Sequence, residues 1–285
     1  MRFSKFQGLG NDYIIINEKD GIIIPESHKP KFSQFLCRRR YSIGADGVLF
    51  VCPPTRNDAE IRMRIFNADG SEAEMCGNGI RCFAKYVYEK GLTRNTEIRV
   101  ETLAGIKIPT LFIKNGTVEK IEVNMGVPKL LRNEIPMKGP NTEVISEKLE
   151  VDNETVIVTC LSVGNPHCVI FTDDLTDLDI TQGKKIELHE IFPKKINVEY
   201  VKVLNRHEIS MRVWERGVGE TLACGTGACA SAVACVLNNK TDRRITVHLL
   251  GGDLEIFWDD TINQIYMIGP AEYVFEGEVE ISTIK

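Results

Sequence analysis

The sequence contains no Cys-x-x-Cys pair, although it has nine cysteines among its 285 residues. Structural zinc sites and thioredoxin-type redox sites use that spacing, so its absence argues against both. The chain also lacks a phosphate-binding P-loop and a His-Glu-x-x-His zinc motif. We therefore expect most of the thiols to be small buried apolar residues. These are Cys37, Cys52, Cys82, Cys160, Cys168, Cys229 and Cys235.

The sequence also has little that would suit a membrane or a nucleic acid. No apolar run approaches the length of a membrane span, and Gly, Asn and Asp interrupt the first residues, where a signal peptide would be apolar. The net charge is −5, and the only basic cluster, Arg38-Arg39-Arg40, follows an amphipathic stretch, which is typical of a solvated helix end. We therefore expect a soluble, cytoplasmic protein of two ordinary domains with reduced thiols and no nucleic-acid or membrane partner.

One long motif occurs twice at a constant offset of 148 residues (208 minus 60). Residues 60–84 read EIRMRIFNADGSEAEMCGNGIRCFA, and residues 208–232 read EISMRVWERGVGETLACGTGACASA. Nine of the 25 aligned positions are identical, including one Cys-Gly-x-Gly in each copy. A repeat of this length indicates two copies of one structural unit. Only Cys76 and Cys224 stand in repeated, glycine-flanked positions.

Alternating apolar residues predict strands of largely antiparallel sheets. In the first copy, Ile61, Met63 and Ile65 face one way, and the second copy repeats this pattern. Glycines that recur at similar offsets indicate that the duplication extends beyond the motif. The other predicted strands cover residues 98–103, 121–125, 156–163, 168–171, 198–203, 245–249, 254–258 and 274–281.

Helices are expected directly after both Cys-Gly-x-Gly motifs. The first has one apolar stripe and ends at Gly91. The second, residues 228–237, is apolar or small on every side, which is typical of a buried helix. The sequence therefore predicts a strand-loop-helix unit that occurs twice, with each helix enclosed by a curved sheet.

A weaker repeat places a Gly-Asn before a strand in each half. Gly10-Asn11 precedes one apolar run, and Gly164-Asn165 precedes Pro166-His167 and the next. Gly-Asn alone commonly forms turns. Because the two Gly-Asn pairs match each other and accompany the two matched cysteines, we expect them to bind a ligand.

The predicted positions of the two cysteines suit proton transfer at a carbon atom. Unpaired N–H groups at a helix start lower the pKa of a thiol and attract an anion such as a carboxylate. Inverting a stereocentre requires a proton to leave one face and another to reach the opposite face. A single base would have to move around the substrate to reach both faces. Two cysteines on opposite sides, one a thiolate and the other a thiol, can exchange the protons without such a movement. The adjacent Glu215 and Arg216, which replace Asn67 and Ala68 of the first copy, could pair with a distal ammonium and carboxylate.

Over essentially its whole length the chain resembles the diaminopimelate epimerases, which are cofactor-independent enzymes. The resemblance lies in FQGLGNDY, IGADG, RIFNADGSEAEMCGNGIRC, SVGNPHCV, INVEYV, WERGVGETLACGTGACA and IGPAEYVFEGE. It implies an α/β (α+β) fold of two pseudo-symmetric domains, each a mostly antiparallel, barrel-like sheet around a central helix, with the active site in the cleft between them. The implied halves are 1–128 plus 272–285 and 129–271, so that strand 274–281 returns to the first domain.

The resemblance also implies a role for each matching residue. Cys76 and Cys224 correspond to the acid–base pair, and His167 and Glu215 are placed to modulate the two thiols. Gly47 stands where some members carry a side-chain amide, so a contact there would come from the backbone. The implied substrate is diaminopimelate, with no cofactor, no metal and a homodimeric assembly. The implied substrate contacts are Asn11, Asn67, Gly77, Asn78, Asn165, Asn197, Glu215, Arg216, Gly225 and Thr226.

Three other readings compete with this one. Proline-racemase-like and phenazine-biosynthesis-like isomerases share the implied fold, but the former carry His where this chain has Asn78, and the latter lack the cysteine pair. A dinucleotide-binding fingerprint fits Gly225-x-Gly227-x-x-Ala230 only formally, because no long buried strand leads into it. A non-enzymatic thiol sensor would use the same two cysteines, and an assay of α-proton exchange would distinguish it from an epimerase.

Overall fold

The computed structural model describes residues 1–152 and 154–280. The chain forms two compact units: unit 1 contains Met1–Val123 and the segment from Gly269 onward, and unit 2 contains Asn124–Ile268. No helix among the described residues is long and apolar enough to cross a membrane.

Unit 1 is built on one sheet with a helix on each face. Its elements are β1 (Arg2–Gly8), β2 (Asn11–Asn17), the 3₁₀ turn η1 (Glu26–His28), α1 (Lys29–Cys37), β3 (Gly47–Cys52), β4 (Ile61–Asn67), β5 (Glu72–Ala73), α2 (Gly77–Glu89), β6 (Val100–Thr102), β7 (Gly105–Lys107), β8 (Thr110–Lys114), β9 (Thr117–Gly126), whose last residues belong to unit 2, and β19 (Glu272–Glu278). The strand order is β19-β1-β2-β3-β4-β6-β7, with β5 beside β4. Helix α2 contacts β1 to β4, and α1 contacts β3 and β4. Strands β2 and β3 are apolar on both faces because both faces are covered.

Unit 2 repeats this plan around its own central helix. Its elements are β10 (Val144–Val151), β11 (Glu154–Ser162), β12 (Pro166–Phe171), η2 (Ile180–Gln182), α3 (Gly183–Glu187), β13 (Asn197–Asn205), β14 (Glu208–Glu215), β15 (Gly219–Thr221), α4 (Gly225–Leu237), β16 (Arg244–Leu249), β17 (Gly252–Asp259) and β18 (Gln264–Gly269). The strand order begins β10-β11-β12-β13-β14-β16-β17-β18, with β15 beside β14. Helix α4 contacts β11 to β14 and also β16 and β17.

The two strand orders match one for one from β19 to β7 and from β10 to β17. The relative direction of neighbouring strands also matches. The parallel pairs are β2–β3 and β4–β6 in unit 1 and β12–β13 and β14–β16 in unit 2. The other pairs along these two strand orders are antiparallel. Gly105 and Gly252 begin equivalent strands, both with positive φ. The duplication therefore extends over both sheets, as the recurring glycines predicted.

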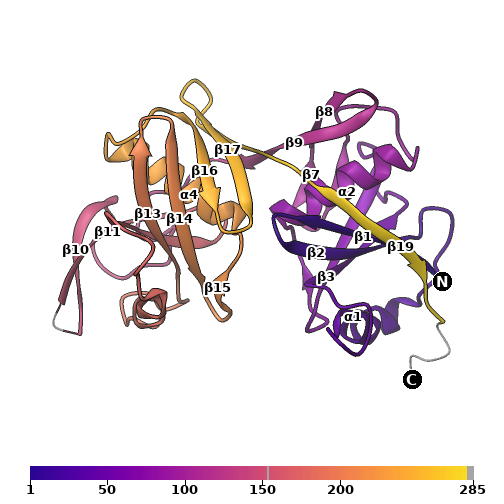
Figure 1. The fold of residues 1–285 in the computed structure, drawn as a ribbon, viewed down its shortest axis with the longest axis horizontal. Coiled ribbons are helices and arrows are strands. Elements are labelled where there is room, and N and C mark those ends of the chain that lie inside the picture. The colour runs from indigo at the N-terminus through magenta and orange to yellow at the C-terminus, as the bar shows by residue number, and fades with distance from the viewer. Residues whose placement is uncertain (153, 281–285) are drawn as a thin grey trace. The chain divides into compact units, whose positions relative to one another are not determined.

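The predicted strands are confirmed, and β19 pairs with β1 of unit 1 (Figure 1). Residue Ile281, at the end of the last predicted strand, lies outside the described residues. All seven cysteines expected to be apolar core residues are buried.

Helix α2 buries the apolar stripe that the sequence predicts and also buries its other faces. Its residues from Asn78 to Val87 are all buried, including Arg81 and Lys85. Arg81 donates to the carbonyls of Pro270 and Gly77, and Lys85 donates to the carbonyl of Val118. This burial agrees with the prediction that a sheet encloses the helix, and backbone acceptors satisfy the two charged side chains inside the unit.

Candidate functional site

Both repeated cysteines are the N-cap residues of central helices. Cys76 has φ −143° and ψ 124°, and Cys224 has φ −122° and ψ 107°, so both are extended. Each sulfur accepts a hydrogen bond from the third helical amide, Gly79 N–H at 3.5 Å and Gly227 N–H at 3.4 Å. Each helix start thus holds a sulfur beside N–H groups that have no acceptor within the helix and so suit an anion.

In unit 1, the hydroxyl of Tyr13 lies 2.9 Å from the Cys76 sulfur. The same hydroxyl donates a short hydrogen bond to Asn11 Oδ1. Asn11 Nδ2 donates to the Asp46 carboxylate at 2.7 Å, and Asn78 Nδ2 donates to Asn11 Oδ1 at 3.3 Å. Unit 1 therefore brings the implied substrate contacts Asn11 and Asn78 together with Cys76 through Tyr13.

The strand register places Asn67 at the same edge. Gly47 pairs with Tyr13 on one side and with Asn67 on the other. A Cβ at Gly47 would lie 2.9 Å from the carbonyl oxygen of Phe66, which is closer than side-chain atoms normally approach. The glycine at this position is therefore required by the packing of β3 against β4. Asn67 itself is exposed and donates to the Ser71 hydroxyl.

In unit 2, Cys224 is buried beside a chain of polar side chains. Its sulfur lies 3.5 Å from the Thr226 hydroxyl, which accepts from Asn165 Nδ2 at 3.1 Å. Asn165 Oδ1 lies 3.0 Å from His167 Nε2, and His167 Nδ1 lies 2.7 Å from Glu199 Oε1. Both His167 and Glu199 have no exposed side-chain surface. The structure therefore links Asn165, His167 and Thr226 to Cys224, as it links Asn11 and Asn78 to Cys76.

Burial raises the pKa of the Cys224 thiol well above its usual value. The charges of Glu215 and Glu199 raise it further, whereas the Thr226 hydroxyl and the Gly227 amide oppose the shift. The expectation that the helix start brings this thiol towards neutrality is wrong, because desolvation and two carboxylates outweigh the helix N–H groups. The surroundings of Cys224 therefore favour its thiol form over its thiolate form.

The remaining implied side-chain contacts in unit 2 lie where β13 begins and β14 ends. Asn197, which pairs with His167, accepts from the backbone N–H of Arg216 at 2.9 Å. Thr221 donates to the Glu215 carboxylate at 2.5 Å, and the Arg216 guanidinium donates to the Lys194 carbonyl at 3.0 Å. Asn197 thus orients the turn that carries Arg216.

Sequence reasoning missed three residues that touch this machinery: Tyr13, Asp46 and Glu199. Tyr13 could have been found, because it stands two residues after Asn11 as His167 stands two residues after Asn165. Glu199 could have been noticed less easily, as a carboxylate within an otherwise largely apolar predicted strand. Asp46 could be recognised only from its contact with Asn11.

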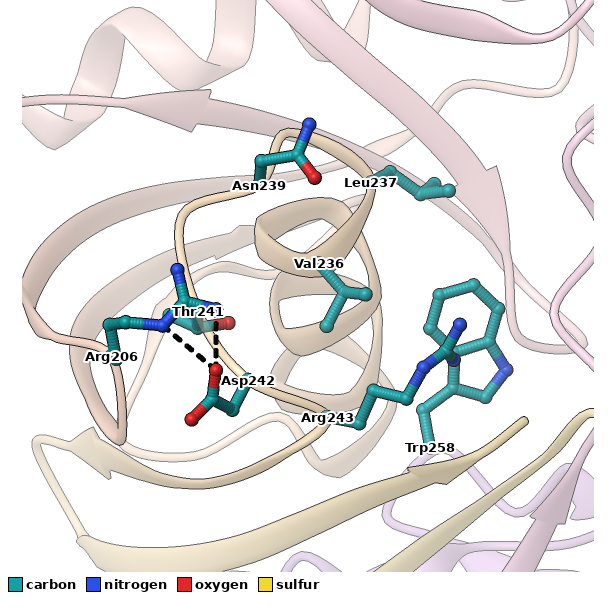
Figure 2. A pocket seen from close by; sticks show the side chains of 8 residues that line it. All are labelled: Arg206, Val236, Leu237, Asn239, Thr241, Asp242, Arg243 and Trp258. Carbon is teal, nitrogen blue, oxygen red and sulfur yellow. Dashed lines mark hydrogen bonds and ion pairs between the residues drawn. The ribbon is translucent and has the colours of Figure 1, made fainter.

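A separate hollow of about 680 Å³ lies at the C-terminal end of α4 (Figure 2). It contains neither repeated cysteine, since Cys224 caps the opposite end of this 13-residue helix, about 20 Å away. Its Arg206 is paired with Asp242, and its Arg243 lies over the Trp258 ring at 4.4 Å. The charges that line this hollow are therefore already partnered, and we assign it no substrate.

Comparison with known proteins gives consistent matches over nearly the whole chain. A family model described as "Diaminopimelate epimerase" matches residues 3–131 and 159–274. A protein named "Diaminopimelate epimerase" from Moorella thermoacetica is 51% identical over 279 residues, which cover 98% of this chain and 99% of the relative. A protein of the same name from Methanothermobacter thermautotrophicus is 49% identical over 278 residues, covering 96% and 97%.

Solved structures share the fold at low identity. A probable proline racemase from Agrobacterium radiobacter K84 has a TM-score of 0.72 and 12% identity, and the match covers 98% of this chain and 93% of that one. A phenazine biosynthesis protein of the PhzF family from Bacillus anthracis has a TM-score of 0.68 and 18% identity, and the match covers 99% of both chains. These likenesses confirm the predicted fold class.

Proposed function

Because this chain belongs to the diaminopimelate epimerase family, we propose that it interconverts LL- and meso-2,6-diaminopimelate for lysine and peptidoglycan synthesis. The observation that carries the mechanism is the pair of N-cap cysteines, each at the same position of one duplicated unit. In one direction, a Cys76 thiolate takes the α-proton while the Cys224 thiol gives its proton to the opposite face. In the other direction the two thiols exchange these roles. Neither step needs a cofactor or a metal.

The proposed stabilisation of the reacting carbon comes from the helix starts. Gly77 and Asn78 at one helix, and Gly225 and Thr226 at the other, would cradle the substrate carboxylate with N–H and side-chain donors. The same groups oppose the negative charge that develops when the α-proton leaves. The two units are thus proposed as two epimerase halves that contribute one thiol and one helix start each.

Recognition of the distal end is proposed for the polar side chains outside the helix starts. Glu215 carries a negative charge that suits an ammonium group, and Arg216 can form a bidentate pair with a carboxylate. Asn11, Asn67, Asn165 and Asn197 would supply neutral contacts. His167 and Glu215 are proposed to modulate the thiols, which accords with the effect of the Glu215 charge on Cys224.

A homodimer in the cytoplasm completes the proposal. Strand β19 stands at one end of the strand order and carries three exposed apolar side chains, Tyr273, Val274 and Phe275. Apolar side chains on an edge strand suit a partner of the same kind. Light scattering of the purified protein and of Val274→Lys would show whether this edge mediates a dimer. All nine cysteines, which lie within the described residues, are free thiols, as suits a reducing compartment.

The test is an epimerisation assay with LL-diaminopimelate in a chelator, without added cofactor and with a thiol reductant. The wild-type protein is expected to form meso product, and Cys76→Ala and Cys224→Ala are expected to form none. Cys82→Ala and Cys235→Ala, which remove buried thiols from the same two helices, are matched controls. Failure of the wild type to convert the substrate would refute the activity. Near-native turnover by either catalytic variant would refute the two-thiol mechanism.

A further inference from the structure

The Tyr13 side chain has one hydroxyl proton and two acceptors within reach. The residue is 4% exposed, and its hydroxyl contacts both the Cys76 sulfur and Asn11 Oδ1. A phenol donates one hydrogen bond at a time, although its oxygen can also accept. The protonation state of Cys76 therefore decides which acceptor the phenol can serve.

The orientation of Asn11 fixes the arrangement when Cys76 is a thiol. Asn11 Nδ2 faces the Asp46 carboxylate, so its Oδ1 faces Tyr13 and can only accept. Tyr13 then donates to Asn11, and its oxygen accepts from the Cys76 S–H group. In this series of hydrogen bonds from Cys76 to Tyr13 to Asn11, each donated hydrogen has one acceptor.

The arrangement must change when Cys76 becomes a thiolate. A thiolate has no proton to give and is a charged acceptor, which forms a stronger hydrogen bond than a neutral amide oxygen does. The Tyr13 proton then turns from Asn11 to the sulfur. Among the described residues, Asn11 Oδ1 then keeps its contact with Asn78 Nδ2 at 3.3 Å, and it can accept a second hydrogen bond from an ammonium group.

We propose that Tyr13 is a positioning residue that stabilises the Cys76 thiolate and simultaneously releases Asn11 Oδ1 to accept a hydrogen bond from the substrate ammonium. This inference rests on the proposed function and deepens it. Formation of the base and formation of the amine-binding acceptor are coupled, because both depend on one proton. No proton leaves Tyr13 in this exchange.

The surroundings keep Tyr13 in the neutral form that can donate. Burial raises the pKa of Tyr13 well above its usual value, and the Cys76, Cys82 and Asp46 charges raise it further. The other titratable groups of α2 nearby are Arg81 and Lys85, which act on Cys82. Asp46, before β3, is held by Arg39 at 2.9 Å.

Unit 2 offers an internal control for the role proposed for Tyr13. His167 takes the place of Tyr13 in the strand register, but its ring contacts Asn165 and Glu199, and Cys224 contacts the Thr226 hydroxyl. Removing the phenol should therefore affect Cys76 alone. A general loosening of the fold would affect both thiols.

The experiment measures alkylation of each cysteine in the intact protein with iodoacetamide. The labelled peptides of Cys76 and Cys224 are quantified by mass spectrometry between about pH 6 and pH 11, a range that extends above ordinary thiol ionisation because burial raises the pKa of Cys224. Tyr13→Phe is compared with wild type and with Tyr86→Phe, which alters another buried tyrosine of unit 1 that packs on Phe6. In Tyr13→Phe the alkylation midpoint of Cys76 should rise by about one pH unit, since a hydrogen bond to the charged form is lost. The midpoint of Cys224, and both midpoints in Tyr86→Phe, should stay unchanged.

An unchanged Cys76 midpoint, or an equal shift at Cys224, would overturn the inference. If Tyr13→Phe does not fold, 3-fluorotyrosine at position 13 gives the same test, because it keeps the ring and makes the hydroxyl a stronger donor. That variant should lower the Cys76 midpoint, and an unmoved midpoint would again contradict the inference. Alkylation needs no turnover, so its outcome is separate from that of the epimerisation assay.

Discussion

Unit 1 and unit 2 share a strand order and a cysteine-capped helix, yet they surround the two cysteines with different side chains. Cys76 meets a neutral phenol, and in the strand register Leu49 lies where unit 2 has Glu199. Cys224 lies in the field of two carboxylates that raise its pKa. The duplicated backbone therefore fixes where each sulfur lies, and the side chains of β2, β3, β12 and β13 give the two sulfurs different surroundings.

The glycines that follow the cysteines show how closely these side chains approach. A Cβ at Gly79 would meet Leu49 at 3.5 Å, an ordinary contact, whereas a Cβ at Gly227 would lie 2.8 Å from the Glu199 carboxylate. Unit 2 thus has less space at its helix start because a buried carboxylate occupies it. A side chain at position 227 would displace Glu199, one of the two carboxylates that add to the effect of burial in raising the pKa of Cys224.

The largest expected effect comes from weakening each thiol in turn. Cys76→Ser and Cys224→Ser should both lower turnover by about 10³-fold or more, since a hydroxyl is a poorer acid and base at neutral pH. Steady-state rates in both directions, with circular dichroism as the folding control, check this. A large loss in only one variant would show that the two units are not equivalent partners in catalysis.

A smaller loss is expected from the residue that has no counterpart in unit 1. Arg216→Ala should lower kcat/KM for diaminopimelate by about 10²-fold, and Arg216→Lys should not restore it, because lysine lacks the bidentate fork. The matched control is Arg206→Ala, which changes a surface arginine elsewhere in unit 2. An unchanged specificity constant in Arg216→Ala would remove this residue from recognition.

The electrostatic difference between the units can be reduced by one substitution. Glu199→Gln should lower the alkylation midpoint of Cys224 by about one pH unit, because a carboxylate that disfavours the thiolate is neutralised. The Cys76 midpoint should not move. Glu187→Gln, a buried carboxylate of α3 that pairs with Trp214, is the control. A rise in the Cys224 midpoint would reverse the assigned sign of the Glu199 contribution.

The last prediction concerns stability at high pH, where each buried thiol should change the folding equilibrium by about tenfold per pH unit. Burial raises the pKa of Cys82 in unit 1 and of Cys235 in unit 2 to about 12. The unfolded thiols ionise near their ordinary value of about 8.5, so each thiol stabilises the fold below that pH, and this stability is lost as pH rises towards 12. Each should contribute a slope of about 1.4 kcal/mol per pH unit in that window. Urea unfolding at several pH values should give a shallower slope for Cys82→Ala and for Cys235→Ala, and an unaltered slope would contradict the shift.

The repeat at a constant offset explains why so much of the fold was predictable. It aligned β4 with β14 and α2 with α4, and the capped helix start follows from Cys-Gly-x-Gly in both. The same offset hid Tyr13, because the segment that contains it corresponds to unit 2 at an offset of 154 (165 minus 11) rather than 148. The spacing of Tyr13 from Asn11 and of His167 from Asn165 indicates that the two residues are equivalent, and the strand register places them in equivalent positions.

The electrostatics of the site could not be predicted, because they depend on burial. The helix start alone suggested a readily ionised thiol at position 224, but the sulfur is desolvated and lies close to Glu199, a residue far from it in sequence. The buried charges of α2 were missed for a similar reason. Carbonyl groups of distant segments satisfy Arg81 and Lys85, and sequence periodicity contains no information about them.

The most direct test of the central claim, one base from each unit, follows the isotope at the α-carbon in heavy water. With LL substrate, early meso product should carry deuterium at the inverted carbon, because the donating thiol has exchanged with solvent. Recovered LL substrate should contain almost none, since the accepting thiolate returns the same proton to the same face before it exchanges. Nuclear magnetic resonance or mass spectrometry of both isomers at low conversion gives the two values. Substantial transfer of the original hydrogen into meso product would contradict the account, because only a single base could carry it from one face to the other.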